Sequence, residues 1–119
     1  MRLDLRLDTR IAQGVSPRAM IRRPVDTVAD AAERIAAERV GALGVCAGDR
    51  LVGIISEHDL VRAVADGVDP HEVPVDACAT WGVHTAPLDE RTTTVAHRML
   101  DLAVRCMPAV HRGRVIGVV

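Results

Sequence analysis

The chain contains one apolar segment twice, at a fixed interval. Gly53-Ile54-Ile55 returns as Gly117-Val118-Val119, 64 positions later. Other positions agree at the same interval, among them Ala32 with Ala96, Arg34 with Arg98, Val40 with Val104 and Arg50 with Arg114. Self-similarity at a fixed period indicates a duplicated supersecondary unit. A chain of 119 residues fits one compact module, so we predict a single module built from two repeats.

The first copy has the pattern helix, strand, strand, helix. Apolar residues recur at helical spacing from Val28, and Thr27 with Asp30 forms a Ser/Thr-x-x-acid start signal; this helix is expected to end near Val40-Gly41. Strands are predicted at Ala42 to Ala47 and Leu51 to Ile55, around a Gly48-Asp49 turn. Ser56 then caps a second helix that ends near Gly67 and carries an apolar stripe of Leu60, Val61, Val64 and Ala65.

The second copy repeats the first helix and the two strands. We expect Val95, Ala96, Met99, Leu102 and Ala103 to form its helix face. The predicted strands are Met107 to His111 and Arg114 to Val119, with a turn at Arg112-Gly113. The resulting division is an N-terminal extension at 1–13, repeat 1 at 14–68, a connector at 69–80 and repeat 2 at 81–119.

The N-terminal extension has a different pattern. Residues 2–8 alternate strictly between leucine and charged residues, which is typical of a strand. An edge strand, an interaction strand and an extension from a misplaced start all fit this pattern.

Composition limits the kinds of partner. Phe and Tyr are absent and Trp81 is the only aromatic residue, so the core must come from Val, Leu, Ile, Ala and Met. Base-stacking platforms for single-stranded nucleic acid are missing. The formal net charge of −1 indicates neither a polyanion partner nor an anionic membrane surface. All basic residues other than His are arginines, so an isolated Arg here is weak evidence of a phosphate site.

Cysteine and histidine usage favours a reduced compartment without a metal centre. Cys46, Cys78 and Cys106 form no Cys-x-x-Cys pair, and the five histidines form no short metal-ligand motif. The start of the chain lacks the apolar stretch of a signal peptide, and no apolar run reaches the length of a membrane span. We therefore expect a cytoplasmic protein with no metal, and neither a nucleophile–base pair nor a phosphate-cradling glycine loop indicates an enzyme.

The most informative motif follows the second strand of the first copy. The sequence there is Gly53-Ile54-Ile55-Ser56-Glu57-His58-Asp59, which ends in Ser-x-x-Asp at a predicted helix start. Free N–H groups and the helix dipole at such a start favour a phosphate. An aspartate one turn further on offers two acceptor oxygens that suit a ribose diol. The same pair also serves as a helix cap, and both interpretations remain open.

These residues resemble the cystathionine-β-synthase-type domain (CBS domain) in its tandem form, the Bateman module, and the run from Gly53 to Pro70 is similar to bacterial members. The resemblance covers about residue 14 to the C-terminus. It implies an α/β (α+β) fold of two β-α-β-β-α repeats related by a pseudo-two-fold axis. It also implies a non-catalytic regulatory module that binds an adenosine-containing ligand between the repeats, of the AMP, ADP, ATP or S-adenosylmethionine class.

The resemblance also implies particular ligand contacts. Asp59 corresponds to the residue that holds the ribose, Ser56 to one near the phosphate and Ile54 to one at the base. From the second copy, Arg105 has the spacing to a strand Pro of a phosphate-binding residue in the AMP-activated kinase γ subunit. Gly82 and Val83 match positions on the first strand of the second copy that line the adenine.

Gly41, Gly44 and the end of the sequence predict that some ligand contacts of the family are missing. Gly41 and Gly44 stand where a basic residue and a Pro would extend the phosphate site, so tight triphosphate binding is not expected. The sequence ends at Val119, where a second Ser/Thr-x-x-Asp and a closing helix would follow. The second repeat is therefore expected to lack its final helix, and the chain to hold at most one complete adenosyl site.

The partners follow from the same features. Apolar surface left uncovered on the second copy favours association, and two-fold pairing is the commonest form, so a homodimer is expected. The regulated protein is unknown. The alternative function is a pure interaction or dimerisation module with an empty nucleotide cleft, and a metal or thiol-redox role is a weaker third.

Overall fold

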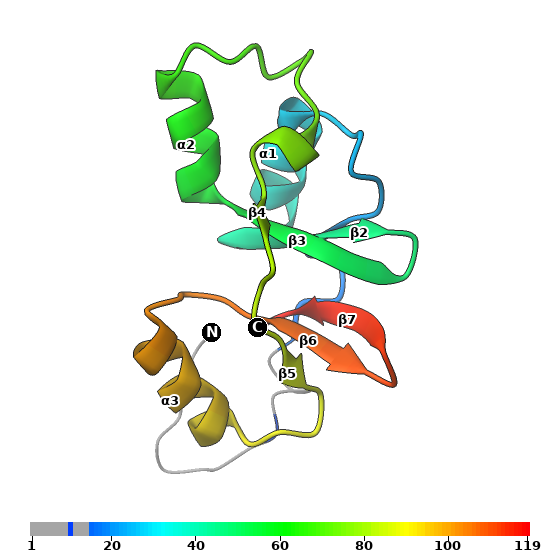
Figure 1. Ribbon diagram of the computed structural model, residues 1–119, viewed down its shortest axis with the longest axis vertical. Coiled ribbons are helices and arrows are strands. Elements are labelled where there is room, and N and C mark those ends of the chain that lie inside the picture. The colour runs from blue at the N-terminus through cyan, green and yellow to red at the C-terminus, as the bar shows by residue number, and fades with distance from the viewer. Residues whose placement is uncertain (1–9, 11–14) are drawn as a thin grey trace.

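The computed structural model describes residue 10 and residues 15–119 (Figure 1). The predicted strand at residues 2–8 lies outside them. The described elements, in chain order, are β1 (Met20–Ile21), α1 (Val28–Glu38), β2 (Ala42–Ala47), β3 (Arg50–Ser56), α2 (Glu57–Ala65), the 3₁₀ helix η2 (Val75–Ala77), β4 (Thr80–Trp81), β5 (Ala86–Pro87), α3 (Thr92–Leu102), β6 (Pro108–His111) and β7 (Arg114–Val118). This mixed α+β order confirms the predicted fold class.

Helix ends follow local sequence chemistry. Thr27 and Asp30 form a capping box at the start of α1, as predicted. The helix α1 ends at Arg39 and α3 ends at Ala103, and both of these cap residues have left-handed backbone conformations, with φ of 55° and 56°. The helix α2 ends just before Gly67, whose φ of +81° suits a glycine after a helix.

Two sheets stack one above the other in Figure 1, with strand orders β1-β2-β3-β4 and β5-β6-β7. The pairs β2–β3 and β6–β7 are antiparallel hairpins, and β1 and β5 lie parallel to β2 and β6. Arg112 and Gly113 both have positive φ at the second hairpin turn, which is the geometry of the tight turns that match strand twist. The four predicted hairpin strands are thus confirmed within a residue at each end.

A short segment of each repeat pairs with a strand of the other repeat. In repeat 2, β4 pairs antiparallel with β3 of repeat 1, matching Ile54 with Thr80. In repeat 1, Ser16 bridges Val118 of β7 in the same antiparallel sense. Ile54 lies 64 positions before Val118, and Ser16 lies 64 positions before Thr80. The two exchanged contacts are therefore equivalent under the sequence repeat.

This exchange corrects one expectation. Gly82 and Val83 were expected on the first strand of the second copy. They instead lie between β4 and β5, outside any strand, and β4 belongs to the sheet of repeat 1. A two-residue strand carries too little periodicity to be recognised from sequence.

The repeated glycine makes the exchange sterically possible. A Cβ at Gly53 would lie 2.7 Å from the carbonyl oxygen of Thr80. A Cβ at Gly117 would clash in the same way with the carbonyl oxygen of Ser16. Close backbone approach is a recurrent reason for glycine within a strand.

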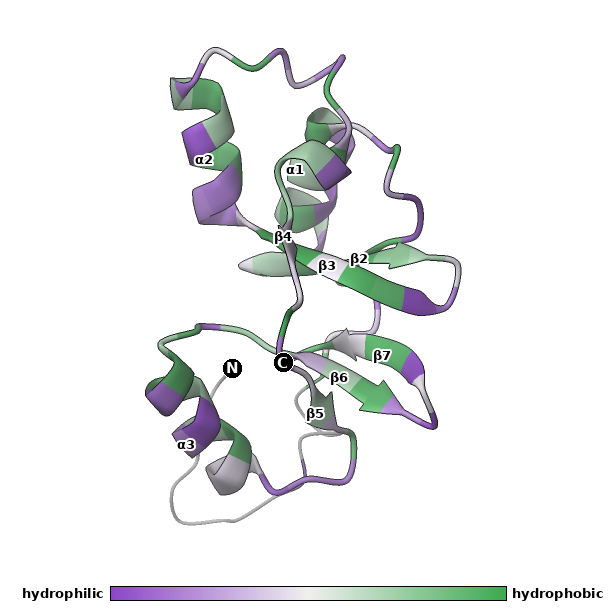
Figure 2. Ribbon diagram, viewed as in Figure 1, coloured by the Kyte–Doolittle hydropathy of each residue, from purple (hydrophilic) through white to green (hydrophobic). Residues whose placement is uncertain are grey.

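The cores of the two repeats interlock. The larger cluster is built around Leu43, Val45, Ile55 and Val75 and includes Val118 of β7. The second contains Val95, Met99, Met107 and Val119, with Val15 packed against it. Trp81 is 53% exposed, so the described core is aliphatic, as predicted. Figure 2 shows hydrophobic residues along the strands and hydrophilic ones at the hairpin turns.

The predicted apolar stripe of α2 is only partly buried. Ala63 is the buried residue of α2, whereas Val61 and Val64 are 66% and 65% exposed. In α3, Val95, Ala96 and Met99 are buried as expected, but Leu102 is 38% exposed and Ala103 is the exposed cap. These helices each place one narrow side on their own sheet, so apolar periodicity overestimates what they bury.

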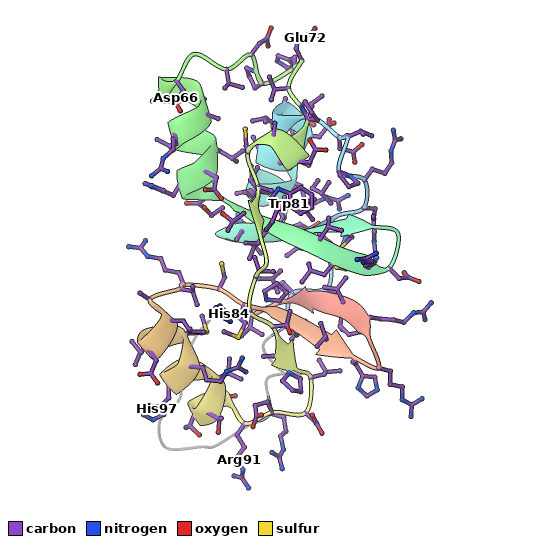
Figure 3. All side chains as sticks on the ribbon, in the orientation of Figure 1. Asp66, Glu72, Trp81, His84, Arg91 and His97 are labelled. Atoms are coloured by element: carbon purple, nitrogen blue, oxygen red, sulfur yellow. The ribbon has the colours of Figure 1, made fainter. Side chains whose placement is uncertain are left out.

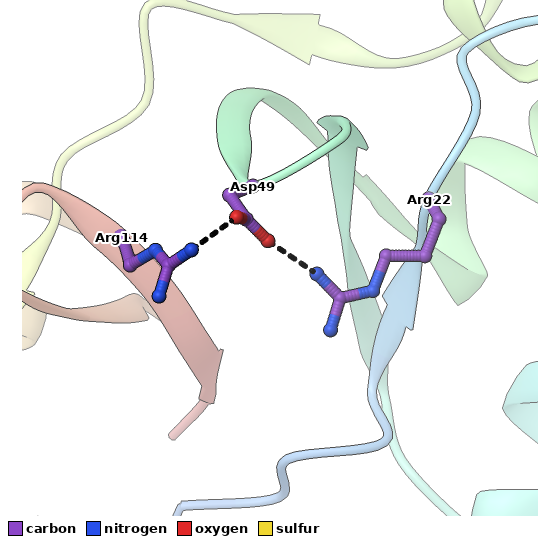
Figure 4. A network of polar contacts seen from close by, with 3 residues as sticks. All are labelled: Arg22, Asp49 and Arg114. Carbon is purple, nitrogen blue, oxygen red and sulfur yellow. Dashed lines mark hydrogen bonds and ion pairs between the residues drawn. The ribbon is translucent and has the colours of Figure 1, made fainter.

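At the turn end of the hairpins the repeats are joined directly. The carboxylate of Asp49 lies 2.7 Å from Arg114 Nη2 and 3.8 Å from Arg22 Nη1, so one aspartate bridges both repeats (Figure 4). A small cluster of Met20, Cys46 and Val115 packs alongside. All three charged side chains are more than half exposed, so the ion pairs contribute about 0–1 kcal/mol each. We call these six residues the hairpin clasp.

Candidate functional site

A cleft of about 910 Å³ lies between the repeats at the end of the hairpins opposite the clasp. Its walls are the end of α1, the start of α2, the segment after β4, the loop from α3 to β6 and the end of β7. Both repeats therefore contribute to one cavity. All six residues predicted from sequence line it: Ile54, Ser56, Asp59, Gly82, Val83 and Arg105.

Ser56 and Asp59 form a capping box at the start of α2. Asp59 Oδ2 accepts hydrogen bonds from Ser56 N at 2.8 Å and from Ser56 Oγ at 3.0 Å, while Asp59 N donates to Ser56 Oγ at 3.2 Å. Within the described residues no hydrogen bond ends on Asp59 Oδ1. The cap thus occupies one carboxylate oxygen and leaves the other for a ligand, so capping and ligand binding are compatible.

The start of α2 offers fewer donors than expected. Glu57 N donates to the carbonyl oxygen of Gly41 at 3.0 Å, because the start of β2 runs beside the helix. The N–H groups of Ser56 and Asp59 are used in the capping box. The expectation of several free N–H groups at this helix start is therefore wrong, and a phosphate here needs help from side chains.

Apolar and backbone surfaces come from both repeats. Ile54 is half-buried on β3, opposite Thr80 of β4. Gly82 follows with φ of +67°, a conformation that favours glycine, and it turns the chain so that Val83 is half-buried at the cleft. Apolar side chains beside exposed backbone suit an aromatic base.

Two arginines reach the cleft, one from each repeat. Arg105 lies exposed in the loop between α3 and β6, and Arg39 is the exposed C-terminal cap of α1. Sequence reasoning missed Arg39, because its position within a predicted helix gave no sign that it faces the other repeat. A cation at a helix C-terminus is also a common stabilising choice, which hid any second role.

Histidines add further polar groups. His58 and His84 both line the cleft and are exposed, and Figure 3 shows His84 at the level between the two sheets. His58 Nε2 lies 3.1 Å from Arg62 Nη2 one turn along α2. His58 is thus an exposed residue of α2 that also reaches the cleft.

The cysteines behave as apolar residues. Cys106 lines the cleft, and burial, with a smaller effect from the Asp59 carboxylate, raises the pKa of its thiol. Burial also raises the pKa of Cys46 and of Cys78. All three are free, and their thiols stay protonated at neutral pH. Among residues 10 and 15–119, no three His, Cys, Asp or Glu side chains group as a metal site.

Within residues 10 and 15–119, no helix has the length and apolar character of a membrane-spanning segment.

Comparison with known proteins identifies the architecture. The sequence profile of the CBS domain matches residues 23–66. An uncharacterized protein of Methanocaldococcus jannaschii is 35% identical over 71 residues, which are 60% of this chain and 25% of that protein. The chain thus spans about a quarter of the length of this relative.

Solved structures extend the likeness to both repeats. A crystal structure of a CBS domain protein has a TM-score of 0.82 at 26% identity, covering 95% of this chain and 91% of that one. A CBS domain protein from Pyrobaculum aerophilum complexed with AMP has a TM-score of 0.80 at 25% identity, covering 92% of this chain and 86% of that one. The CBS domain pair of protein MJ0100, in complex with 5′-methylthioadenosine and S-adenosyl-L-methionine, has a TM-score of 0.81 at 25% identity. The match covers 95% of this chain and 90% of that one. Residues 23–66 thus match the CBS domain, and the chain, with its internal repeat and exchanged strands, has the fold of a tandem CBS domain pair.

Proposed function

We propose that this chain is a non-catalytic regulatory module whose cleft binds an adenosine-containing ligand. The observation that carries the proposal is the composition of the cleft. It combines a carboxylate oxygen without a partner in the described residues, apolar surface and two arginines, drawn from both repeats. The ligands named for the P. aerophilum protein and for MJ0100, AMP and S-adenosyl-L-methionine, support the ligand class.

The proposed contacts follow the chemistry of each wall. Asp59 Oδ1 accepts hydrogen bonds from the ribose hydroxyls, and a charged acceptor makes such bonds strong. The base lies against Ile54, Gly82 and Val83. Ser56 and Arg105 lie at the phosphate.

The regulatory part of the proposal rests on the shared cleft. A ligand that contacts both repeats stabilises one relative arrangement of them, by as much as its affinity differs between arrangements. A regulated partner protein would respond to that arrangement. We also propose a cytoplasmic location, on the sequence argument given above.

We further propose that the module works as a homodimer. Large apolar side chains are exposed on two helices: Val61 and Val64 on α2, and Leu100 and Leu102 on α3. The expected uncovered surface at the end of repeat 2 is not where it was predicted, since Val118 and Val119 are buried. Helix faces, rather than that sheet, are the surfaces that a second copy would cover.

The alternative is an interaction module with an empty cleft. It is favoured by the use of Asp59 Oδ2 and of the α2 N–H groups inside the protein. A capping box that binds no ligand would make the same hydrogen bonds.

Calorimetry with AMP, ADP, ATP and S-adenosyl-L-methionine separates the two. Loss of a hydrogen bond to a charged group costs about 1.5–3 kcal/mol, so Asp59→Ala is expected to weaken binding by roughly 10-fold to 100-fold. The matched control is Asp30→Ala, which removes the same capping interaction from α1, outside the cleft. Both variants lose similar stability, but Asp30→Ala retains wild-type affinity. No heat with any of the four ligands, or equal affinity for wild type and Asp59→Ala, would leave only the interaction module.

A further inference from the structure

The two cleft arginines differ from most others in the described chain in having no protein partner. The backbone N–H of Arg39 donates to the carbonyl oxygen of Ile35, but within residues 10 and 15–119 the side chains of Arg39 and Arg105 make no ion pair or hydrogen bond. Several other arginines lie within ion-pair distance of a carboxylate: Arg18, Arg22, Arg23, Arg34 and Arg114. The guanidinium groups at the cleft are therefore available to a ligand.

The backbone at Arg39 makes an arginine there a costly choice. Its φ of 55° and ψ of 46° are left-handed, a region in which a side chain is disfavoured and glycine is usual. The equivalent residue of repeat 2, Ala103, has the same left-handed conformation. The fold, and not the arginine side chain, therefore determines the backbone conformation at this position. The backbone strain is therefore common to both repeats, and what distinguishes position 39 is the guanidinium that it brings to the cleft wall.

The electrostatics of the cleft create a need for that role. Glu57 and Asp59 bring negative charge to the start of α2, and the nearby N–H groups of Ser56, Glu57 and Asp59 are used within the protein. An anionic ligand group would be repelled there without added cations. Gly41, the sequence equivalent of Arg105 in repeat 1, supplies none, whereas Arg39 lies two residues before it.

We propose that Arg39 and Arg105, one from each repeat, together hold the phosphate of a nucleoside phosphate and make the cleft prefer it over the uncharged nucleoside. This deepens the proposed function and rests on it. Guanidinium groups bind phosphate oxygens in bidentate geometry, an interaction that an uncharged nucleoside cannot make. Because the two arginines belong to different repeats, the phosphate also links the repeats across the cleft.

The test compares AMP with adenosine by calorimetry on the full chain. Wild type is expected to bind AMP at least about tenfold more tightly than adenosine, the effect of one charge-assisted hydrogen bond. Arg39→Gln removes most of that preference and leaves adenosine affinity unchanged. The control Arg50→Gln removes an exposed arginine at the other end of the hairpin, outside the cleft lining, and binds both ligands as wild type does.

A second variant separates this role from stabilisation of α1. Arg39→Gly suits the left-handed cap, so the melting temperature of the ligand-free protein stays equal or rises while AMP affinity falls. If Arg39 served only the helix dipole, the melting temperature would fall and AMP affinity would not change.

The outcomes also separate this inference from the proposed function. Equal affinity of wild type for AMP and adenosine overturns the arginine pair but leaves an adenosine site. If Arg39→Gln keeps the full preference of wild type for AMP over adenosine, the arginine pair is likewise overturned and the adenosine site remains. Binding of neither AMP nor adenosine overturns the arginine pair, and the proposed function falls with it if ADP, ATP and S-adenosyl-L-methionine also fail to bind.

Discussion

At the scale of single residues, the same capping chemistry is used twice with different consequences. Thr27 and Asp30 cap α1, and Ser56 and Asp59 cap α2. Only the second pair faces the cleft. Hydrogen bonds from Thr27, chiefly from its backbone N–H, lower the pKa of the Asp30 carboxyl below its ordinary value.

The lowered pKa of Asp30 predicts a specific acid sensitivity. A carboxyl with a lowered folded-state pKa contributes stability that is complete above its unfolded pKa of about 4 and is lost as the pH falls through the folded pKa. Asp30→Asn is expected to reduce the melting temperature at pH 7 and to converge on wild type as the pH is lowered below about 4. Thermal unfolding followed by circular dichroism measures this. A constant difference between the two proteins at every pH would contradict it.

Residue-scale prediction succeeded where the signal is local. Ser56 and Asp59 were recognised because three-residue spacing alone defines a cap. Arg39 was missed because its importance depends on where α1 ends and on what faces it across the cleft. Neither fact is contained in the neighbouring sequence.

At the scale of elements, the reciprocal exchange of β4 and Ser16 positions the cleft wall. It places the segment that follows β4 against β3, and the repeated glycine permits the contact. The recurrence of Gly53 as Gly117 thus has a steric cause, distinct from the ligand motif that follows only the first.

Gly53→Ala is therefore expected to destabilise the protein. Its Cβ would meet the Thr80 carbonyl oxygen at 2.7 Å, and backbone must shift to relieve it. Overpacking of this kind costs about 1–3 kcal/mol. Gly41→Ala is the control, since it has open space and no positive φ and is expected to be neutral or to gain about 0.4–1 kcal/mol. Urea unfolding of both variants decides, and equal stability would refute the steric role.

Hairpins and helices were predictable because each carries its own periodicity and turn residues. The Gly48-Asp49 and Arg112-Gly113 turns defined both hairpins. The exchanged strands were not predictable, since two residues show no period. The apolar stripe of α2 was predicted, but its exposure was not, because periodicity reports an apolar face without telling what covers it.

At the scale of the whole molecule, the clasp joins the repeats at the turn end of the hairpins, and the exchanged pairs Ser16–Val118 and Ile54–Thr80 join them beside the cleft. Val118 of repeat 2 packs in the core of repeat 1, and the hairpin clasp links the turns. The cleft lies at the opposite ends of the same hairpins. A ligand in the cleft, as proposed, would therefore contact both repeats at the end opposite the clasp.

The most direct test of this account is the amide spectrum of ¹⁵N-labelled protein during titration with AMP. We predict shifts at residues 56–59 of repeat 1 and, at the same AMP concentrations, at residues 82–84 and Arg105 of repeat 2, with the Gly48 and Gly113 turns unmoved. Shifts confined to one repeat, or absent from both, would contradict a binding site shared between the repeats.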